Sequence, residues 1–252
     1  MLQRRQSFLH KKYKKETTGR YSVLWILSGR LIVLEFTKEG IPVKIDEWSL
    51  LKKQYNNTSI PDLWFEISKS QQYAPLKTVV NNSDLWLFTC QPFKEPYELL
   101  EIDYNRLLSI GLKENLWCYF IVEDSWQHFR QAGSVITHVA EPLFGLSTQY
   151  KDVIVSFLDS GRLWVAFFNS SRKLFFFNVF EASGSKEWIF WHVHISQLLD
   201  IKNVFLPIGS PDEWKKELGR HGKLLELRSN IKPRNYEPNL PIERYFLMLN
   251  FS

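Results

Sequence analysis

Two short segments of this chain carry the residue types best suited to chemistry. Asp159, in the sequence Asp159-Ser160-Gly161, supplies a carboxylate, a group that can bind a magnesium ion. Gly209 lets the backbone approach a ligand closely, and Ser210 opens a predicted helix whose free N–H groups can hold an anion. Each segment also has a plain structural interpretation. Asp-Ser-Gly is an ordinary β-turn sequence, and Gly-Ser is an ordinary strand-to-helix turn with a good cap.

The turn at Asp159 belongs to a motif that the chain uses twice. Apolar runs are interrupted by Ser-Gly-Arg-Leu at residues 28–31 and again at residues 160–163, and both are followed by a polar turn and a third apolar run. A repeat that spans half a chain predicts two similar lobes. We therefore expect equivalent halves that begin near residues 20 and 150.

Histidine and cysteine spacings favour no catalytic or metal site. His192 and His194 are two residues apart on a predicted helix, so they point to different faces and cannot chelate one metal ion. His138 is a lone histidine within a strand, without a serine or cysteine nucleophile in a recognisable elbow. Cys90 and Cys118 lie in apolar runs, which indicates buried thiols of a reducing compartment.

The charge is concentrated at the N-terminus. The net charge is +5, and residues 1–20 hold seven basic residues against one acidic residue, so the remainder is close to neutral. Residues 1–18 have no stable apolar period, and we expect them to form a basic, flexible tail. With no signal peptide and no apolar stretch long enough to span a membrane, the expected location is cytoplasmic.

The first half is expected to open with three strands, at residues 21–27, 31–37 and 41–48. A hairpin is expected at 76–90, around Asn81-Asn82-Ser83-Asp84, and a helix at 95–108. A buried strand at 116–122, a short strand at 135–139 and a helical turn at 142–148 complete this half. The predicted domains are the tail, a first lobe at 19–150 and a second lobe at 151–252.

The second half has a cleaner pattern. Strands are expected at 152–158, 163–168 and 174–180, then a helix at 186–199, a strand at 204–208, a helix at 211–218 capped by Ser210, a strand at 223–227 and a helix at 241–251. Three antiparallel strands that lead into alternating helices and strands make a mixed sheet covered by helices. The predicted class is α/β with mixed sheets. Its aromatic helix start (Trp188, Phe190, Trp191) fits either core packing or an exposed partner anchor.

This order resembles the actin-like ATPase fold of actin, sugar kinases and heat-shock ATPases, which is ribonuclease H-like. In that superfamily the first hairpin turn of each lobe, typically Asp-x-Gly, cups nucleotide phosphates. A strand that ends in Gly-Gly lies beside the adenosine. The resemblance implies nucleotide turns at Ser28-Gly29, at Asp159-Ser160-Gly161 and at Gly209-Ser210.

The first lobe departs from the superfamily pattern. Its turn reads Leu27-Ser28-Gly29-Arg30, without the carboxylate that in these ATPases helps to hold the hydrated magnesium ion. The second half also resembles a family of uncharacterised Bacteroidetes proteins with an actin-like fold. That resemblance rests on its Phe-rich strands at 167–169 and 173–180, the aromatic-rich helix after them and Tyr245-Phe246.

Three functional hypotheses follow. The leading one is a non-catalytic scaffold or adaptor with degenerate nucleotide turns, no catalytic residue, no metal and no cofactor. The second is an ATP-binding small-molecule kinase or ATPase that uses ATP and Mg²⁺ between the lobes, with Glu123 or Asp124 as a base and Arg30 and Arg162 as substitutes for lost charge stabilisation. The third, less favoured, is a nucleic-acid-associated factor that uses the basic tail. The expected partner is another protein, with a weakly bound nucleotide as the second candidate.

Overall fold

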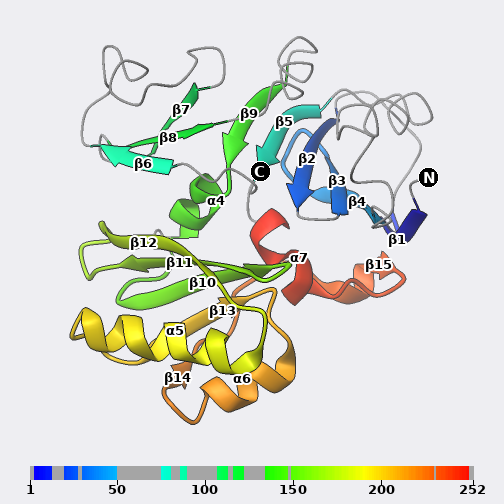
Figure 1. Cartoon of the computed structure of the whole chain (residues 1–252). Coiled ribbons are helices and arrows are strands. Elements are labelled where there is room, and N and C mark those ends of the chain that lie inside the picture. The colour runs from blue at the N-terminus through cyan, green and yellow to red at the C-terminus, as the bar shows by residue number, and fades with distance from the viewer. Residues whose placement is uncertain are drawn as a thin grey trace. The chain divides into compact units, whose positions relative to one another are not determined.

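The computed structural model divides the chain into two compact units. The first spans Met1–Glu141 and Asn235–Pro238, and the second spans Pro142–Arg234 and Asn239–Ser252. Within them the structure describes residues 3–12, 20–27, 30–49, 75–80, 86–89, 107–112, 116–121, 134–146, 149–229 and 231–249. Figure 1 shows the elements of both units.

The first unit is built on a sheet of seven strands in the order β15-β1-β4-β3-β2-β5-β9. Its members are β1 (Gln3–His10), β2 (Tyr21–Leu27), β3 (Arg30–Phe36), β4 (Pro42–Ser49), β5 (Pro75–Val80), β9 (Val135–His138) and β15 (Tyr236–Glu237). A second sheet has the order β6-β8-β7 and consists of β6 (Trp86–Thr89), β7 (Leu107–Gly111) and β8 (Trp117–Ile121). The helix α4 (Ala140–Gly145) carries the chain on into the second unit.

The second unit is built on a sheet of five strands in the order β12-β11-β10-β13-β14. Its strands are β10 (Val153–Asp159), β11 (Arg162–Phe168), β12 (Leu174–Glu181), β13 (Val204–Ile208) and β14 (Lys223–Leu224). Its other elements are α5 (Ser185–Leu198), α6 (Asp212–Leu218), the short 3-10 helix η6 (Pro233–Asn235) and α7 (Ile242–Leu249). The alternation of strands and helices expected for this half is confirmed.

Both large sheets contain the same strand order. In the first unit β2, β3 and β4 form an antiparallel meander, and β5 and β9 follow in parallel beside β2. In the second unit β10, β11 and β12 form the meander, and β13 and β14 follow in parallel beside β10. The predicted α/β class, with mixed sheets that each open with a three-strand meander, is therefore confirmed.

Near-continuous apolar runs form the central strands because both faces of each sheet are covered. In β2 and β3 every residue after the first is buried, and the same holds for β11. On one face of the second sheet, α5 packs Trp188, Ile189 and Ile195 against Leu163 and Val165 of β11. Trp188 is thus a core residue, whereas Phe190 is exposed.

The N-terminal segment departs from expectation. Residues 3–10, expected to be a flexible tail, form β1 and pair with β4 on one side and β15 on the other. Phe8 is buried in this strand, and Tyr236 of β15 donates a hydrogen bond from its hydroxyl to the Pro42 carbonyl at 2.6 Å. The strands that pair with β1 are distant from it in the sequence, so the local composition did not reveal this strand.

Other differences concern local elements. No hairpin joins β5 to β6, because these two strands belong to different sheets. Leu107 and Leu108, expected in a helix, lie in β7, while residues 95–106 fall outside the described residues. The strand expected at 223–227 is limited to Lys223–Leu224. The compact units divide at residues 141 and 142 instead of 150 and 151, and Asn235–Pro238 joins the first unit.

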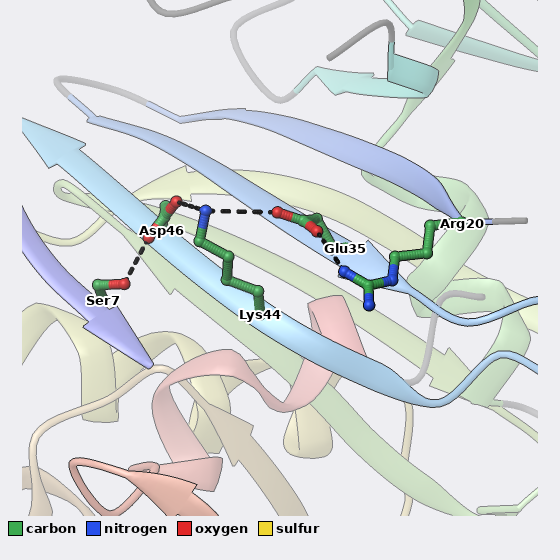
Figure 2. Close-up of polar contacts among 5 residues, drawn as sticks. All are labelled: Ser7, Arg20, Glu35, Lys44 and Asp46. Carbon is green, nitrogen blue, oxygen red and sulfur yellow. Dashed lines mark hydrogen bonds and ion pairs between the residues drawn. The ribbon is translucent and has the colours of Figure 1, made fainter. Parts of the chain in front are cut away.

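A chain of alternating charges stabilises one face of the first sheet. The Lys44 ammonium lies 2.8 Å from Asp46 Oδ2 and 3.4 Å from Glu35 Oε1, and Glu35 also pairs with Arg20 at 3.6 Å. Ser7 of β1 donates a hydrogen bond to Asp46 Oδ1 at 2.6 Å (Figure 2). Both carboxylates are buried, so the cation between them offsets much of their desolvation cost. The network also ties β1 to β4.

We expect Lys44→Met to lower the free energy of unfolding by about 2 kcal/mol, because it removes the cation that lies between two buried carboxylates. Lys38→Met, in an exposed turn, is the matched control and should change stability by less than about 0.5 kcal/mol. Urea unfolding followed by tryptophan fluorescence measures both. Equal losses in the two variants would contradict the role given to the network.

Candidate functional site

The turn between β10 and β11 has the geometry of a tight hairpin. Asp159 pairs with Arg162 across the ladder, so Ser160 and Gly161 form a two-residue loop. Their φ angles are 49° and 85°, and positive values at both positions define the type I′ turn that fits the twist of paired strands. Ser160 is exposed, and its hydroxyl donates to Asp159 Oδ1 at 3.4 Å. The local geometry is fully explained by the hairpin.

The carboxylate of Asp159 is enclosed by protein. The residue is 1% exposed, at the buried end of β10. A magnesium ion bound at such a turn keeps several waters, and a carboxylate that holds it directly or through water must face that solvated space. The carboxylate of Asp159 does not face solvent in this structure.

The turn after β13 comes close to this hairpin. Gly209 has a φ of 73°, and a Cβ atom added to it would lie 2.9 Å from the Leu158 carbonyl oxygen and 3.6 Å from the Phe157 ring. Only glycine allows this approach, since a side chain would meet backbone. The structure thus brings Gly209 and Ser210 beside the end of β10. They share the carboxyl edge of the parallel strands with residues 159–161, which is where α/β sheets bind ligands.

Ser210 does not cap the helix as expected. The N-cap of α6 is Pro211, and no side-chain hydrogen bond caps the helix. Ser210 is 8% exposed, and its hydroxyl has no hydrogen-bond partner among the described residues. The first turn of α6 carries Asp212 and Glu213. Their carboxylates interact favourably with the positive end of the helix dipole and repel an incoming anion.

The equivalent turn of the first unit can be described only at its edges. Leu27 and Arg30 are paired, and the two residues between them, Ser28 and Gly29, lie outside the described residues. By strand order Leu27 corresponds to Asp159, and it is a buried apolar residue, 2% exposed. The Arg30 guanidinium lies 3.8 Å from the fully buried carboxylate of Glu47. The base candidates Glu123 and Asp124 also lie outside the described residues.

Sequence reasoning missed a serine–histidine pair in the core of the second unit. His192 Nδ1 donates to the Trp188 carbonyl at 2.7 Å, because a carbonyl can only accept, so Nε2 accepts from the Ser156 hydroxyl at 2.8 Å. Both residues are fully buried, so no substrate reaches the hydroxyl. The pair links α5 to β10, and its partners are 36 residues apart, a separation that no local motif reveals.

The buried histidines and the thiol of Cys118 are held in their neutral forms. Burial lowers the pKa of His192 to about 4 and that of His138 to about 3. His138 Nδ1 accepts a hydrogen bond from the Ala140 backbone N–H at 3.1 Å. Burial raises the pKa of Cys118 to about 12, which leaves an unreactive thiol. His194 is exposed, so the expectation that it and His192 occupy different faces is confirmed.

A second polar group that the sequence did not single out lies at the carboxyl end of β9. The Thr137 hydroxyl donates to Glu141 Oε2, and Lys77 Nζ lies 3.4 Å from Glu141 Oε1. About one third of each charged side chain is exposed. Glu141 lies in the first turn of α4, where a carboxylate is favoured by the helix dipole. The group therefore has a structural role at a helix start.

The second unit also has an open hollow of about 550 Å³. It is lined by Pro207, Lys215, Leu224, Leu225, Glu226, Leu227, Ser229, Pro233, Ile242 and Glu243. Lys215 Nζ is already held by Asp212 at 3.2 Å and by Glu243. The hollow is thus bounded by α6, α7 and the segment after β14, and the charge of Lys215 in it is neutralised. The turn residues discussed above do not line it.

Comparisons with known proteins support the fold. No protein-family model matches the chain, and no curated protein sequence is significantly similar to it. A Bacteroides thetaiotaomicron structure, described as a protein with actin-like ATPase fold and unknown function, matches with a TM-score of 0.69 and 11% identity, over 94% of this chain and 98% of that one. The chain therefore has the actin-like ATPase fold.

Two other solved structures match more loosely. The ethanolamine utilization protein EutJ from Carboxydothermus hydrogenoformans has a TM-score of 0.47 and 10% identity, over 96% of this chain and 90% of that one. The Ppx/GppA phosphatase from Aquifex aeolicus has a TM-score of 0.40 and 10% identity, over 76% and 68%.

Two features are absent from the residues that the structure describes. No cluster of three or more histidine, cysteine or acidic side chains able to hold a metal ion occurs there. Likewise, no helix in that part of the chain is long and apolar enough to cross a membrane.

Gly209→Ala should destabilise the protein by about 2–3 kcal/mol, because it adds a backbone clash at Leu158 to the cost of a positive φ. Gly161→Ala is the matched control: it shares the positive φ but meets nothing within 4 Å, so we expect a loss of about 1 kcal/mol. Chemical denaturation of the two variants gives the difference. Equal losses would show that the close approach of the two turns is not tight.

Stability should fall as the pH is lowered from about 6.5 towards 4. In this window the folded chain keeps His138 and His192 neutral, whereas the same histidines bind protons in the unfolded chain. Their contribution to stability is therefore complete above the pKa of a histidine in the unfolded chain. By pH 5 each histidine lowers the free energy of unfolding by about 2 kcal/mol. Urea unfolding at pH 7.5, 6 and 5 measures the slope. His192→Gln should make the slope shallower, and an unchanged slope would contradict this assignment.

Proposed function

We propose that this protein is a non-catalytic actin-like scaffold or adaptor whose nucleotide turns are degenerate. One observation carries the proposal. The carboxylate expected to serve magnesium in the second turn, Asp159, is enclosed in the protein, and its counterpart in the first unit is the buried Leu27. Neither position offers a solvent-facing acidic group.

The residues present do not fit a magnesium–ATP complex. Magnesium bound with a nucleotide takes one or two carboxylates together with waters and phosphate oxygens. The turn residues described supply no exposed carboxylate for it, and α6 begins with two acidic residues where a phosphate would need positive potential. We therefore derive no catalytic step through this group.

Exposed apolar side chains of the second unit support a partner-binding role. Phe175 of β12 is 65% exposed, and Phe190 and Leu198 of α5 are also exposed. Phe190 is ordered by stacking on His194, with ring centroids 5.2 Å apart. Large, rigid aromatic side chains on a surface are the residues that anchor protein–protein contacts. The sequence left two interpretations of the aromatic helix start, core packing and an exposed partner anchor. The second interpretation applies to Phe190.

One alternative retains a specific observation in its favour. The fold is that of ATPases, and the Gly209 turn places an unpaired Ser210 hydroxyl near the β10–β11 hairpin. An ATP-binding small-molecule kinase or ATPase would use this edge of the sheet. The third hypothesis has less support, because residues 3–10 of the expected flexible tail, which include Arg4 and Arg5, form β1.

Hydrolysis and binding of nucleotide separate the two remaining proposals. With Mg–ATP in excess, the full chain should release phosphate no faster than buffer. Mg–ATP at 5 mM should raise the free energy of unfolding by less than about 0.5 kcal/mol, whereas a site filled at one hundred times its dissociation constant adds about 2.7 kcal/mol.

Asp159→Asn supplies the matched variant for the same assay. Under the scaffold proposal the change affects folding stability and leaves phosphate release at the buffer level. Phosphate release by the wild type that disappears in a folded Asp159→Asn protein would establish the ATPase alternative in its place.

A further inference from the structure

The end strand β14 of the five-stranded sheet stops early, and a proline in its neighbour explains why. β14 pairs in parallel with β13, and the Leu225 N–H still donates to the Phe205 carbonyl at 2.9 Å. The next bond of such a ladder would run from the N–H of residue 207 to the Leu225 carbonyl. Residue 207 is proline, which has no N–H. The ladder therefore ends there, although the sequence pattern predicts a strand as far as residue 227.

Three backbone groups at this point have no hydrogen-bond partner among the described residues. The Pro207 carbonyl points to the same side of β13 as the Phe205 carbonyl, because alternate residues of a strand bond to the same neighbour. The Leu227 N–H, which would reach it in a continued ladder, does not bond to it. The carbonyls of Pro207 and Leu225 and the Leu227 N–H are thus left open, as two acceptors and one donor.

The segment after β14 is held so that its open groups face β13. The buried Tyr150 hydroxyl accepts a hydrogen bond from the Arg228 N–H at 2.9 Å and donates to the Glu226 carbonyl at 3.5 Å. Residues 225–229 contain no turn or bend, so the backbone groups of successive residues point to opposite sides. Residues 226 and 228 bond to Tyr150, and residues 225 and 227 therefore face the other way, towards β13.

The open backbone groups lie at the hollow of the second unit. Pro207, Leu225 and Leu227 all line this hollow of about 550 Å³, and Pro207 is a buried residue. Backbone carbonyls of buried residues are nearly always hydrogen-bonded, so an open one at a hollow calls for a partner from outside the chain. The volume also lies within the range of about 300–1,000 Å³ that is usual for ligand sites.

The other lining residues identify the chemistry of the occupant. Leu224, Pro233 and Ile242 make much of the lining apolar. The Lys215 ammonium is paired with Glu243, and Glu226 is exposed to water, so the lining offers no buried, unpaired charge to a charged ligand. The open groups match an amide, which carries one N–H donor and one C=O acceptor. A peptide supplies amides together with apolar side chains.

We propose that the hollow binds an extended, uncharged peptide segment of a partner protein. Its backbone N–H groups donate to the carbonyls of Pro207 and Leu225, one of its carbonyls accepts from the Leu227 N–H, and an apolar side chain lies against the apolar lining. Main-chain hydrogen bonds to an open sheet edge, with a pocket for a side chain, are a known mode of peptide recognition. Pro207 keeps this edge open. The proposal gives the scaffold a partner site and rests on that proposed function.

Titration of the isotope-labelled full chain with N-acetyl-leucine methylamide, followed by NMR, tests the proposal. We expect saturable shifts of the Leu225 and Leu227 amide signals in the millimolar range. The analogue methylated on both amide nitrogens has no N–H to offer, so it should bind about tenfold more weakly or less, because the two carbonyls stay unpaired. Pro207→Val supplies the missing N–H, lets β14 extend across the opening, and should weaken binding of the probe by about tenfold or more.

Leu227→Lys, which brings a charge to the hollow, provides a second variant and should also weaken binding. Leu198→Lys, on the exposed face of α5, is its matched control and should bind the probe as the wild type does. Circular dichroism verifies that each variant is folded. No saturable shift in the wild type, equal binding of the methylated analogue, or undiminished binding by folded Pro207→Val or Leu227→Lys would each overturn the proposal.

Failure of this site and failure of the scaffold function give different results. A wild type that neither binds the probe nor releases phosphate from ATP refutes the peptide site and leaves the non-catalytic scaffold in place. Phosphate release that depends on Asp159 refutes the scaffold, whatever the probe does.

Discussion

The close approach of two strand ends in the second unit is the constraint on which the rest of the account depends. Gly209 brings its backbone against the Leu158 carbonyl, so the end of β13 is held beside the end of β10. The last residue of β10, Asp159, is buried and does not face solvent. The tight two-residue turn that follows leaves Ser160 as the exposed residue at the tip. The carboxyl edge of these parallel strands therefore ends in a tight turn that follows a buried acidic residue.

The two units use one strand order with different chemistry at the same turn. In both, a meander is followed by two parallel strands, and the first hairpin closes on an arginine, Arg30 or Arg162. The residue before the loop is Leu27 in one unit and Asp159 in the other, and both are buried. Such a pair is what we expect of an internal duplication that has kept its packing. We propose duplication on this basis, and a superposition of the two sheets would test it.

The sequence predicted the meanders and the second half well because their signals are local. Apolar runs separated by short polar turns specify β10, β11 and β12 almost residue by residue. The sequence-based prediction failed for strands whose pairing partners are distant in the sequence. Residues 3–10 become a strand only through β4 and through β15, more than 200 residues away, and β6 pairs with β8 instead of its neighbour β5. The site residues were foreseen as turns, but the enclosure of Asp159 and the Ser156–His192 pair depend on packing that no spacing encodes.

A crystal structure of the full chain, grown with excess ATP and Mn²⁺ in place of Mg²⁺, tests the central claim most directly, because manganese is identified by its anomalous scattering. The account predicts no manganese at the β10–β11 hairpin and an Asp159 carboxylate that remains enclosed. A manganese ion bound by Asp159, directly or through an ordered water with nucleotide phosphates beside Gly161 and Gly209, would contradict it.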